Sequence, residues 1–162
     1  ETPTAAKHLH VPLQSGDDGV LSAMRRRYTT AIYLRRLEPL AAEFNLTSDV
    51  IVGFPAEDGA AFESTLATVE RAGLTKVHVF PYSPRPGTAD AAWDPIPAGM
   101  KAERSRCLRD LAERQGLAHR KALRGTRQRV LVETEEGRGY TDDYTPLVVG
   151  GARPGTIVEV VA

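Results

Sequence analysis

The chain has 162 residues, of which 41% are hydrophobic and 26% charged. This is enough apolar sequence to bury the core of one average domain or of two small ones. Because 21 basic and 21 acidic residues cancel, composition alone favours no polyanionic partner. The single cysteine, Cys107, excludes an internal disulfide and a metal site built from cysteines. No apolar run approaches the roughly 18 residues of a membrane span, and no signal peptide is visible at the start, so we expect a cytoplasmic protein with no membrane partner.

Three short apolar segments end in polar or glycine-rich tips and are separated by helical patterns. This spacing predicts βαβ units, and therefore a parallel sheet with right-handed crossovers and helices on one side. In such sheets the ligand lies at the carboxyl ends of the strands. The predicted strands are His8–Leu13, Leu46–Val52 and Lys76–Tyr82.

The segments between these strands carry helix start and stop signals. Asp17 and Thr29 or Thr30 are typical residues to cap two helices after the first strand. Pro39 is expected to kink or interrupt the second of them. A third helix is predicted to begin at Asp58 and to stop at Gly73.

A proline-rich loop over residues 83–98 follows the third strand, and a loop of this length is usually functional or a cover. We expect its one tryptophan, Trp93, to plug the edge of the sheet. A long helix is predicted from Pro97 to Leu123. Ten basic residues but only three acidic ones lie between Lys101 and Arg129, which indicates either a phosphate-binding face or a solvated helix face with i,i+4 pairs.

The periodicity changes near Arg124, where short alternating strands separated by glycine-containing turns begin. Strands at this spacing predict a small antiparallel β-barrel. We therefore divide the chain into residues 1–123, an α/β domain, and residues 124–162, a barrel. A barrel of about 40 residues is near the lower limit for independent folding, so we expect it to lean on the long basic helix.

Polar and glycine residues at the predicted strand tips are the candidate site residues. Gln14 and Ser15 follow the first strand and could hold a carboxylate or a sugar hydroxyl, or could only cap the next helix. Asp49, on the second strand, is either a site residue or a structural partner, since an isolated buried carboxylate is costly. Gly53 and Phe54 let the backbone approach a flat group closely.

Two further sets of side chains allow more than one interpretation. His8 and His10 point to the same side of the first strand and could bind a metal, but no third ligand is evident and a structural pair is favoured. Tyr82 and Arg85 bracket a turn near the strand ends. They could serve a nucleobase and a phosphate, or only close the mouth of the fold.

Taken together, the chain resembles the C-terminal part of a methylthiotransferase of the radical S-adenosylmethionine superfamily. The resemblance covers nearly the whole chain. It depends on five features in order: the segments at residues 8–16, 24–29, 47–55 and 77–88, and the terminal barrel, which resembles an RNA-binding TRAM domain of the OB-like type. The branch acting on threonylcarbamoyladenosine in tRNA looks most similar, with the isopentenyladenosine branch as the near alternative.

The resemblance implies a partial (βα) barrel followed by an RNA-binding barrel. The full-length enzyme would use S-adenosylmethionine and two 4Fe-4S clusters to add a methylthio group to C2 of a modified adenosine next to the anticodon. The cluster cysteines are absent here, so we expect this chain alone to hold no cofactor and to be inactive. Its partners would be the tRNA anticodon stem-loop and the N-terminal half of the enzyme, with self-association through the exposed sheet edge.

The resemblance also assigns residues to roles. It implies cofactor binding by Gln14, Ser15, Asp49, Gly53 and Phe54. RNA binding is predicted for the arginines near the loop, the helix end and the barrel: Arg85, Arg124, Arg127, Arg129 and Arg138.

The chain departs from the family pattern at three positions: Ala56 replaces a glycine, Asp58 a threonine and Asp17 a serine. Ala56 is compatible with the pattern only if its φ is negative. The alternative function is an RNA-binding module whose α/β part is a non-catalytic scaffold. A CxxxCxxC motif upstream in the same reading frame would favour the enzyme.

Overall fold

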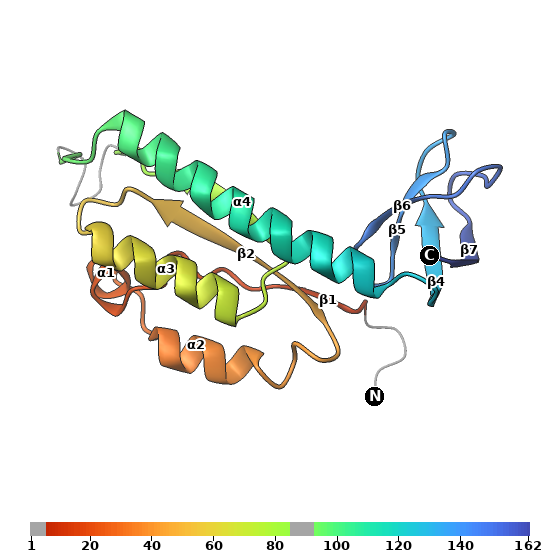
Figure 1. The fold of residues 1–162 in the computed structure, drawn as a ribbon, viewed down its shortest axis with the longest axis horizontal. Helices are drawn as coiled ribbons and strands as arrows, with labels where there is room; N and C mark the ends of the chain where they lie inside the picture. The colour runs from red at the N-terminus through yellow and green to blue at the C-terminus, as the bar shows by residue number, and fades with distance from the viewer. Residues whose placement is uncertain (1–5, 85–92) are drawn as a thin grey trace.

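The computed structural model describes residues 6–84 and 93–162. It consists of a parallel sheet, helices packed on it, and a second, antiparallel sheet that follows the long helix α4 (Figure 1). The elements are β1 His8–His10, α1 Asp18–Ala23, α2 Thr30–Leu37, β2 Asn45–Val52, α3 Gly59–Arg71, β3 Lys76–Pro81, α4 Ala98–Ala122, β4 Arg127–Val132, β5 Arg138–Thr141, β6 Pro146–Val148 and β7 Ile157–Val161.

The first three strands form one parallel sheet in the order β1-β2-β3, as predicted. Side chains alternate between the two faces of a strand, so Val50 and Val52 lie on one face of β2 and their partners across the sheet lie with them. This face packs against α2, α3 and α4 in one core, which includes Leu34, Val69 and Leu108. The prediction that the helices cover one side of the sheet is therefore confirmed.

β1 is shorter than the predicted strand because the hydrogen-bond ladder is interrupted after His10. Pro12 has no N–H to donate, and the N–H of Leu13 donates to the hydroxyl of Ser48 at 2.9 Å instead of to a backbone carbonyl. Pairing with β2 resumes at Gln14, which forms an isolated parallel bridge with Val50. The segment thus stays beside β2 but is not a regular strand.

The predicted helix signals are confirmed. The side chains of Asp17, Thr29 and Asp58 each accept a hydrogen bond from a backbone N–H in the first turn of α1, α2 and α3. α2 ends at Leu37, two residues before Pro39, where a proline removes a helical donor and clashes with the preceding turn.

The second sheet is open, so the prediction of a closed antiparallel barrel is not confirmed. Its strand order is β6-β5-β4-β7, which leaves β6 and β7 as its two edges. Val130 and Val132 of β4 are wholly buried, whereas Val148, Ile157 and Val161 are more than half exposed. With β6 only three residues long, the described strands bury one face of this sheet but do not curl far enough to close it.

The turn between β5 and β6 joins the second sheet to the first. The N–H of Lys7 donates to the carbonyl of Asp142 at 2.7 Å, and the amide of Asn45 donates to the carbonyl of Asp143 at 2.8 Å. Nε2 of His119, near the end of α4, lies 2.7 Å from the Asp143 carboxylate. The second sheet therefore contacts both α4 and the beginnings of β1 and β2.

We expect Asp143→Asn to destabilise the protein at neutral pH by about 1–2 kcal/mol, the scale for hydrogen bonds to a charged group. Burial alone would raise the pKa of Asp143, but hydrogen bonds from His119, Thr141 and Thr145 outweigh burial and hold this pKa well below its ordinary value. A lowered folded-state pKa stabilises the protein above the ordinary pKa of about 4, and this contribution is lost as the pH falls below that value.

Urea unfolding of the wild type and the variant at several pH values measures this contribution. The difference in the free energy of unfolding should be largest at neutral pH and should shrink below about pH 4. Asp142→Asn is the matched control, because Asp142 is exposed and lies at 3.5 Å from Arg129. A pH-independent difference for Asp143→Asn would contradict the prediction.

Candidate functional site

The polar tips of the three parallel strands meet at one edge of the sheet. Gln14 adopts a left-handed conformation (φ 65°), which is uncommon for a residue other than glycine. Its N–H donates to the carbonyl of Asp49 at 2.8 Å, and its carbonyl accepts from the N–H of Ile51 at 2.9 Å. The structure thus fixes the backbone of Gln14 beside β2, and its half-buried side chain is not hydrogen-bonded to any described residue.

Ser15 is wholly buried, unlike Gln14. Its hydroxyl accepts a hydrogen bond from the N–H of Asp17 at 3.2 Å and lies 3.5 Å from the hydroxyl of Thr65 on α3. The turn packs so closely on α3 that a β-carbon at Gly16 would lie 2.5 Å from the Cα of Thr65. In this arrangement Ser15 shapes the turn below the site and presents no hydroxyl at its surface.

Asp49 lies on the face of the sheet that the helices leave uncovered. Its carboxylate is 3.3 Å from Nε2 of His10, and the ring of His10 packs edge-on against that of His78. Nε2 of His8 and Nδ1 of His10 both lie within 3.0 Å of the hydroxyl of Thr47. Both histidines thus have polar partners on β2, and this polar face remains open.

A buried ion pair holds the loop that follows β2. Gly53 has a left-handed conformation (φ 72°), and its N–H donates to Oε1 of Glu57 at 2.7 Å. Arg104 of α4 donates to the same oxygen at 2.6 Å and to the carbonyl of Glu57 at 3.1 Å. Burial raises the pKa of Glu57, an effect only partly offset by the Gly53 N–H and by Arg104.

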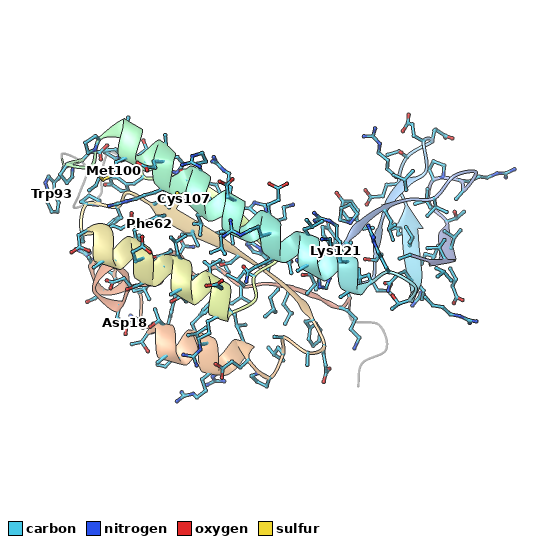
Figure 2. The ribbon with its side chains drawn as sticks, viewed as in Figure 1. Asp18, Phe62, Trp93, Met100, Cys107 and Lys121 are labelled. Atoms are coloured by element: carbon cyan, nitrogen blue, oxygen red, sulfur yellow. The ribbon has the colours of Figure 1, made fainter. Side chains whose placement is uncertain are left out.

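The second carboxylate oxygen of Glu57 is buried and has no hydrogen-bond partner among the described residues. The guanidinium of Arg104 also lies 5.4 Å from the centre of the Phe62 ring, which occupies the layer between α3 and α4 (Figure 2). The sequence pattern does not show that Glu57 and Arg104 are buried, because both resemble ordinary surface residues.

Lys101 of α4 also holds this loop. Glu57, Arg104 and Lys101 together are called the clamp below. Its ammonium donates to both oxygens of Asp94, at 2.5 and 2.7 Å, and to the carbonyl of Tyr82 at 3.0 Å. Its aliphatic stem covers Gly53, where a β-carbon would lie 2.4 Å from Cγ of Lys101. Phe54 packs edge-to-face on Tyr82, with ring centres 5.2 Å apart. The ends of β2 and β3 and the start of α4 are thus locked together.

The structure shows the outcome of two expectations from the sequence, one for Ala56 and one for Trp93. Ala56 is not among the non-glycine residues with positive φ, so replacing the family's glycine there introduces no backbone strain. Trp93 is 55% exposed and lies at the end of the molecule (Figure 2). It does not plug the sheet edge as predicted, because a plug would bury its ring.

The basic residues from Lys101 to Arg129 do not all contribute to one phosphate-binding face, which was one of the two interpretations of the sequence. Lys101 and Arg104 are buried in ion pairs, and Arg106 pairs with Asp110 one turn away. The exposed positive charge of α4 is therefore smaller than the sequence count suggests and lies nearer the helix end.

Four of the arginines predicted to bind RNA lie beyond the end of the parallel sheet that is opposite Gln14 and Gly53: Arg124, Arg127, Arg129 and Arg138. α4 begins beside Gly53 and Tyr82, at the ends of the strands, and passes Thr75, at the start of β3, at Gly116. A helix of 25 residues is about 37 Å long. Arg124 follows it, so the two sets of predicted residues are separated by most of the length of the molecule (Figure 1).

Three of these arginines share one face of the second sheet. Arg127 and Arg129 of β4 alternate with the buried Val130 and Val132, and the pairing of β4 with β5 places Arg138 on the same exposed face. Arg85, the fifth predicted residue, lies outside the described residues. The structure thus brings the arginines of the second sheet together, but it does not bring them close to the residues predicted to bind the cofactor.

Neither cluster ligands nor a metal site is found in the described part of the chain. An iron–sulfur cluster needs several cysteine thiolates, and Cys107 is half-buried against the core. No group of three His, Cys, Asp or Glu side chains over residues 6–84 and 93–162 could hold a metal ion. None of the helices in these ranges is both long and apolar enough to cross a membrane.

The chain is similar in sequence to several known proteins. No family model matches the chain. It is 43% identical over 98% of its length to tRNA-2-methylthio-N(6)-dimethylallyladenosine synthase 1 of Mycobacterium marinum, and 40% identical over 98% to the synthase of Corynebacterium diphtheriae. It is 36% identical over 88% to a threonylcarbamoyladenosine tRNA methylthiotransferase of Thermotoga maritima.

The chain spans about a third of the length of these relatives, between 30% and 34%. All three carry names of tRNA methylthiotransferases, which supports the resemblance at that level. The threonylcarbamoyladenosine branch expected from the sequence is not specifically confirmed, because the two more similar relatives are named synthases of tRNA 2-methylthio-N(6)-dimethylallyladenosine.

Proposed function

We propose that this chain is a region of a radical S-adenosylmethionine enzyme that adds a methylthio group to C2 of a modified adenosine next to the anticodon of tRNA. The observation that carries the proposal is the 36–43% identity, over 88–98% of the chain, to proteins named for this activity. The open polar face and the clamped loop at the strand ends are the structural features that such a region would need.

The modified nucleoside is the finer part of the proposal. The printed names of the relatives each contain a modified adenosine, and the identities of 43% and 40% against 36% favour dimethylallyladenosine. We therefore propose dimethylallyladenosine as the substrate and keep threonylcarbamoyladenosine as the second candidate. Mass spectrometry of the nucleosides formed separates the two.

The cofactor edge would be lined by Gln14, Asp49, Gly53 and Phe54, and Ser15 would shape it from below. The left-handed Gly53 has no side chain, lies buried under the stem of Lys101 and is held by Glu57, so it would fix the loop against which an adenine ring packs. When bound in the intact enzyme, S-adenosylmethionine and two 4Fe-4S clusters supply the radical chemistry. The residues of this chain bind and orient the substrate and cofactor.

The remaining parts of the proposal concern partners and domains. Residues 1–123 would complete a radical barrel together with the N-terminal part of the protein, which would cover the open face at the carboxyl ends of the strands, around Phe80; Phe80 is 50% exposed. Without that part, this face and the free edge of β1 favour self-association. Residues 124–162 would bind the tRNA anticodon stem-loop in the manner of a TRAM domain, through Arg124, Arg127, Arg129 and Arg138 and through Arg85 of the α/β part.

The alternative is an RNA-binding module whose parallel sheet is only a scaffold, and Gln14→Ala in the intact enzyme distinguishes the two. We expect about tenfold weaker S-adenosylmethionine binding, because a carboxamide at the strand tip would lose its hydrogen bonds to the ligand. Calorimetry measures the affinity. Unfolding should be unchanged, because the fold uses only the backbone of Gln14. An unchanged affinity for S-adenosylmethionine would show that Gln14 has only a structural role in the turn.

A further inference from the structure

A groove lies between the two sheets, at the end of the molecule opposite Gln14 and Gly53. Its floor is the beginning of β1, β2 and β3, one wall is the second half of α4, and the other wall is the β5–β6 region. Its volume is about 990 Å³, at the upper end of the range for pockets that take whole small molecules. None of the residues assigned to the cofactor edge lines it.

The groove is positively charged and polar. Lys76, Arg109 and Arg120 line it, and Glu113 is the one acidic residue in the lining. All three cations are exposed, and none of them forms an ion pair with a described residue. Cations left without partners in a concave surface concentrate the positive potential, so the groove favours an anionic ligand.

Stacked aromatic rings form the side of the groove nearest the second sheet. The ring of Tyr144 stacks on His8 of β1 at 5.0 Å and on Tyr140 of β5 at 4.6 Å. Tyr144 has a positive φ of 66°, a strained conformation for a bulky side chain, yet its side chain is 55% exposed. Strain of this kind is retained where the surroundings hold a residue in a required position.

Tyr140 connects the groove to the arginine face of the second sheet. The register of β4 and β5 places Tyr140 opposite Leu131, on the face that carries Arg127, Arg129 and Arg138. Leu131, which is 44% exposed, lies beside Tyr140 on this face, so an extended anionic ligand that runs from these arginines into the groove would pass one apolar side chain.

We infer that this groove is a second contact site for the tRNA substrate and that the groove holds an unpaired strand of the tRNA. Lys76, Arg109 and Arg120 bind its phosphates, and a base adds to the stack of Tyr140 and Tyr144. The combination of phosphate-binding cations with an exposed aromatic stack is the arrangement that recognises single-stranded nucleic acid. The inference rests on the proposed function, which supplies tRNA as the ligand.

The test uses the 162-residue protein and a fluorescently labelled anticodon stem-loop, titrated at several salt concentrations. The groove variant combines Lys76→Ala, Arg109→Ala and Arg120→Ala. We expect it to bind about tenfold or more weakly, and the slope of log K against log salt to become shallower by about 2, because three phosphate contacts to single-stranded RNA are lost. The control removes the same charge from α2 and from the segment between α1 and α2, with Arg26→Ala, Arg35→Ala and Arg36→Ala, and should match the wild type.

Tyr144→Asn tests the aromatic part separately. Asparagine tolerates positive φ, so the variant should fold, which circular dichroism checks. We expect about tenfold weaker binding of the stem-loop, with the salt slope and the binding of fully paired RNA unchanged.

The outcomes separate this inference from the proposed function. If the wild type binds the stem-loop and both the groove variant and the control match it, the groove is not an RNA site and only this inference fails. Competition by polyglutamate at the same concentration as RNA would also overturn it, in favour of an acidic protein partner. If the wild type binds no RNA at low salt, the RNA contact in the proposed function fails as well.

Discussion

Replacing Arg104 with alanine is expected to lower the free energy of unfolding by about 3–5 kcal/mol, the range for removing one partner of a buried ion pair. The carboxylate of Glu57 is wholly buried. Without the guanidinium it would keep only the N–H of Gly53 as a partner, and its second oxygen already has none among the described residues. Urea unfolding followed by circular dichroism measures the loss.

Arg106→Ala is the matched control on the same helix. Arg106 also pairs with a carboxylate, that of Asp110 at 3.4 Å, but both side chains are at least half exposed. An exposed pair of this kind contributes about 0.3–0.5 kcal/mol. Equal losses for Arg104→Ala and Arg106→Ala would show that the clamp on the β2–α3 loop does not stabilise the fold.

Replacing Gly53 with alanine is expected to cost about 3 kcal/mol or more, from two sources. A non-glycine residue in a left-handed conformation costs about 1–3 kcal/mol. The added methyl group would also lie 2.4 Å from Cγ of Lys101, near the root of that side chain. Lys101 would have to shift and loosen its buried contact with Asp94.

Gly73→Ala separates these two sources. Gly73 also has a positive φ, of 64°, but nothing lies within 4 Å of the position that its β-carbon would take. The control should therefore lose only the conformational part, about 1–2 kcal/mol. If the two variants lose the same free energy in urea unfolding, the close approach of Lys101 to Gly53 is wrong.

The parallel sheet could be predicted because its determinants are local. The alternation and spacing of apolar residues, the caps Asp17, Thr29 and Asp58, and the break at Pro39 each act within a few residues of themselves. β1 was predicted too long because the interruption after His10 depends on the hydroxyl of Ser48, which lies 35 residues away from Leu13 in the sequence.

The clamp at the candidate site could not be predicted, because burial of a charge is set by tertiary packing. The sequence predicts Lys101 and Arg104 to lie on an exposed basic helix face, and only the packing of α4 against the β2–α3 loop shows that both are buried. Glu57 follows Gly53 by four residues, but the sequence does not show which cation a carboxylate on this loop pairs with.

The second sheet shows a different limit. Turn signals at Gly137, Gly151 and Gly155, all with positive φ, mark its strands correctly. Closure of a barrel depends on strand number, tilt and stagger, which turn residues do not specify. The left-handed residue in the β5–β6 turn is Tyr144 rather than either aspartate before it, and neither its stacking on His8 nor the groove beside it has a sequence signal.

The measurement that tests the proposed function most directly is nucleoside analysis of tRNA treated with the intact protein that contains this chain. The protein would be prepared without oxygen, with its clusters reconstituted, and incubated with S-adenosylmethionine, a reductant and tRNA that carries dimethylallyladenosine. The tRNA would then be digested and examined by mass spectrometry. Our account predicts the 2-methylthio derivative of that nucleoside, and its loss in the Gln14→Ala enzyme. Protein that holds its clusters and binds this tRNA, yet yields no methylthio derivative of either candidate nucleoside, would contradict it.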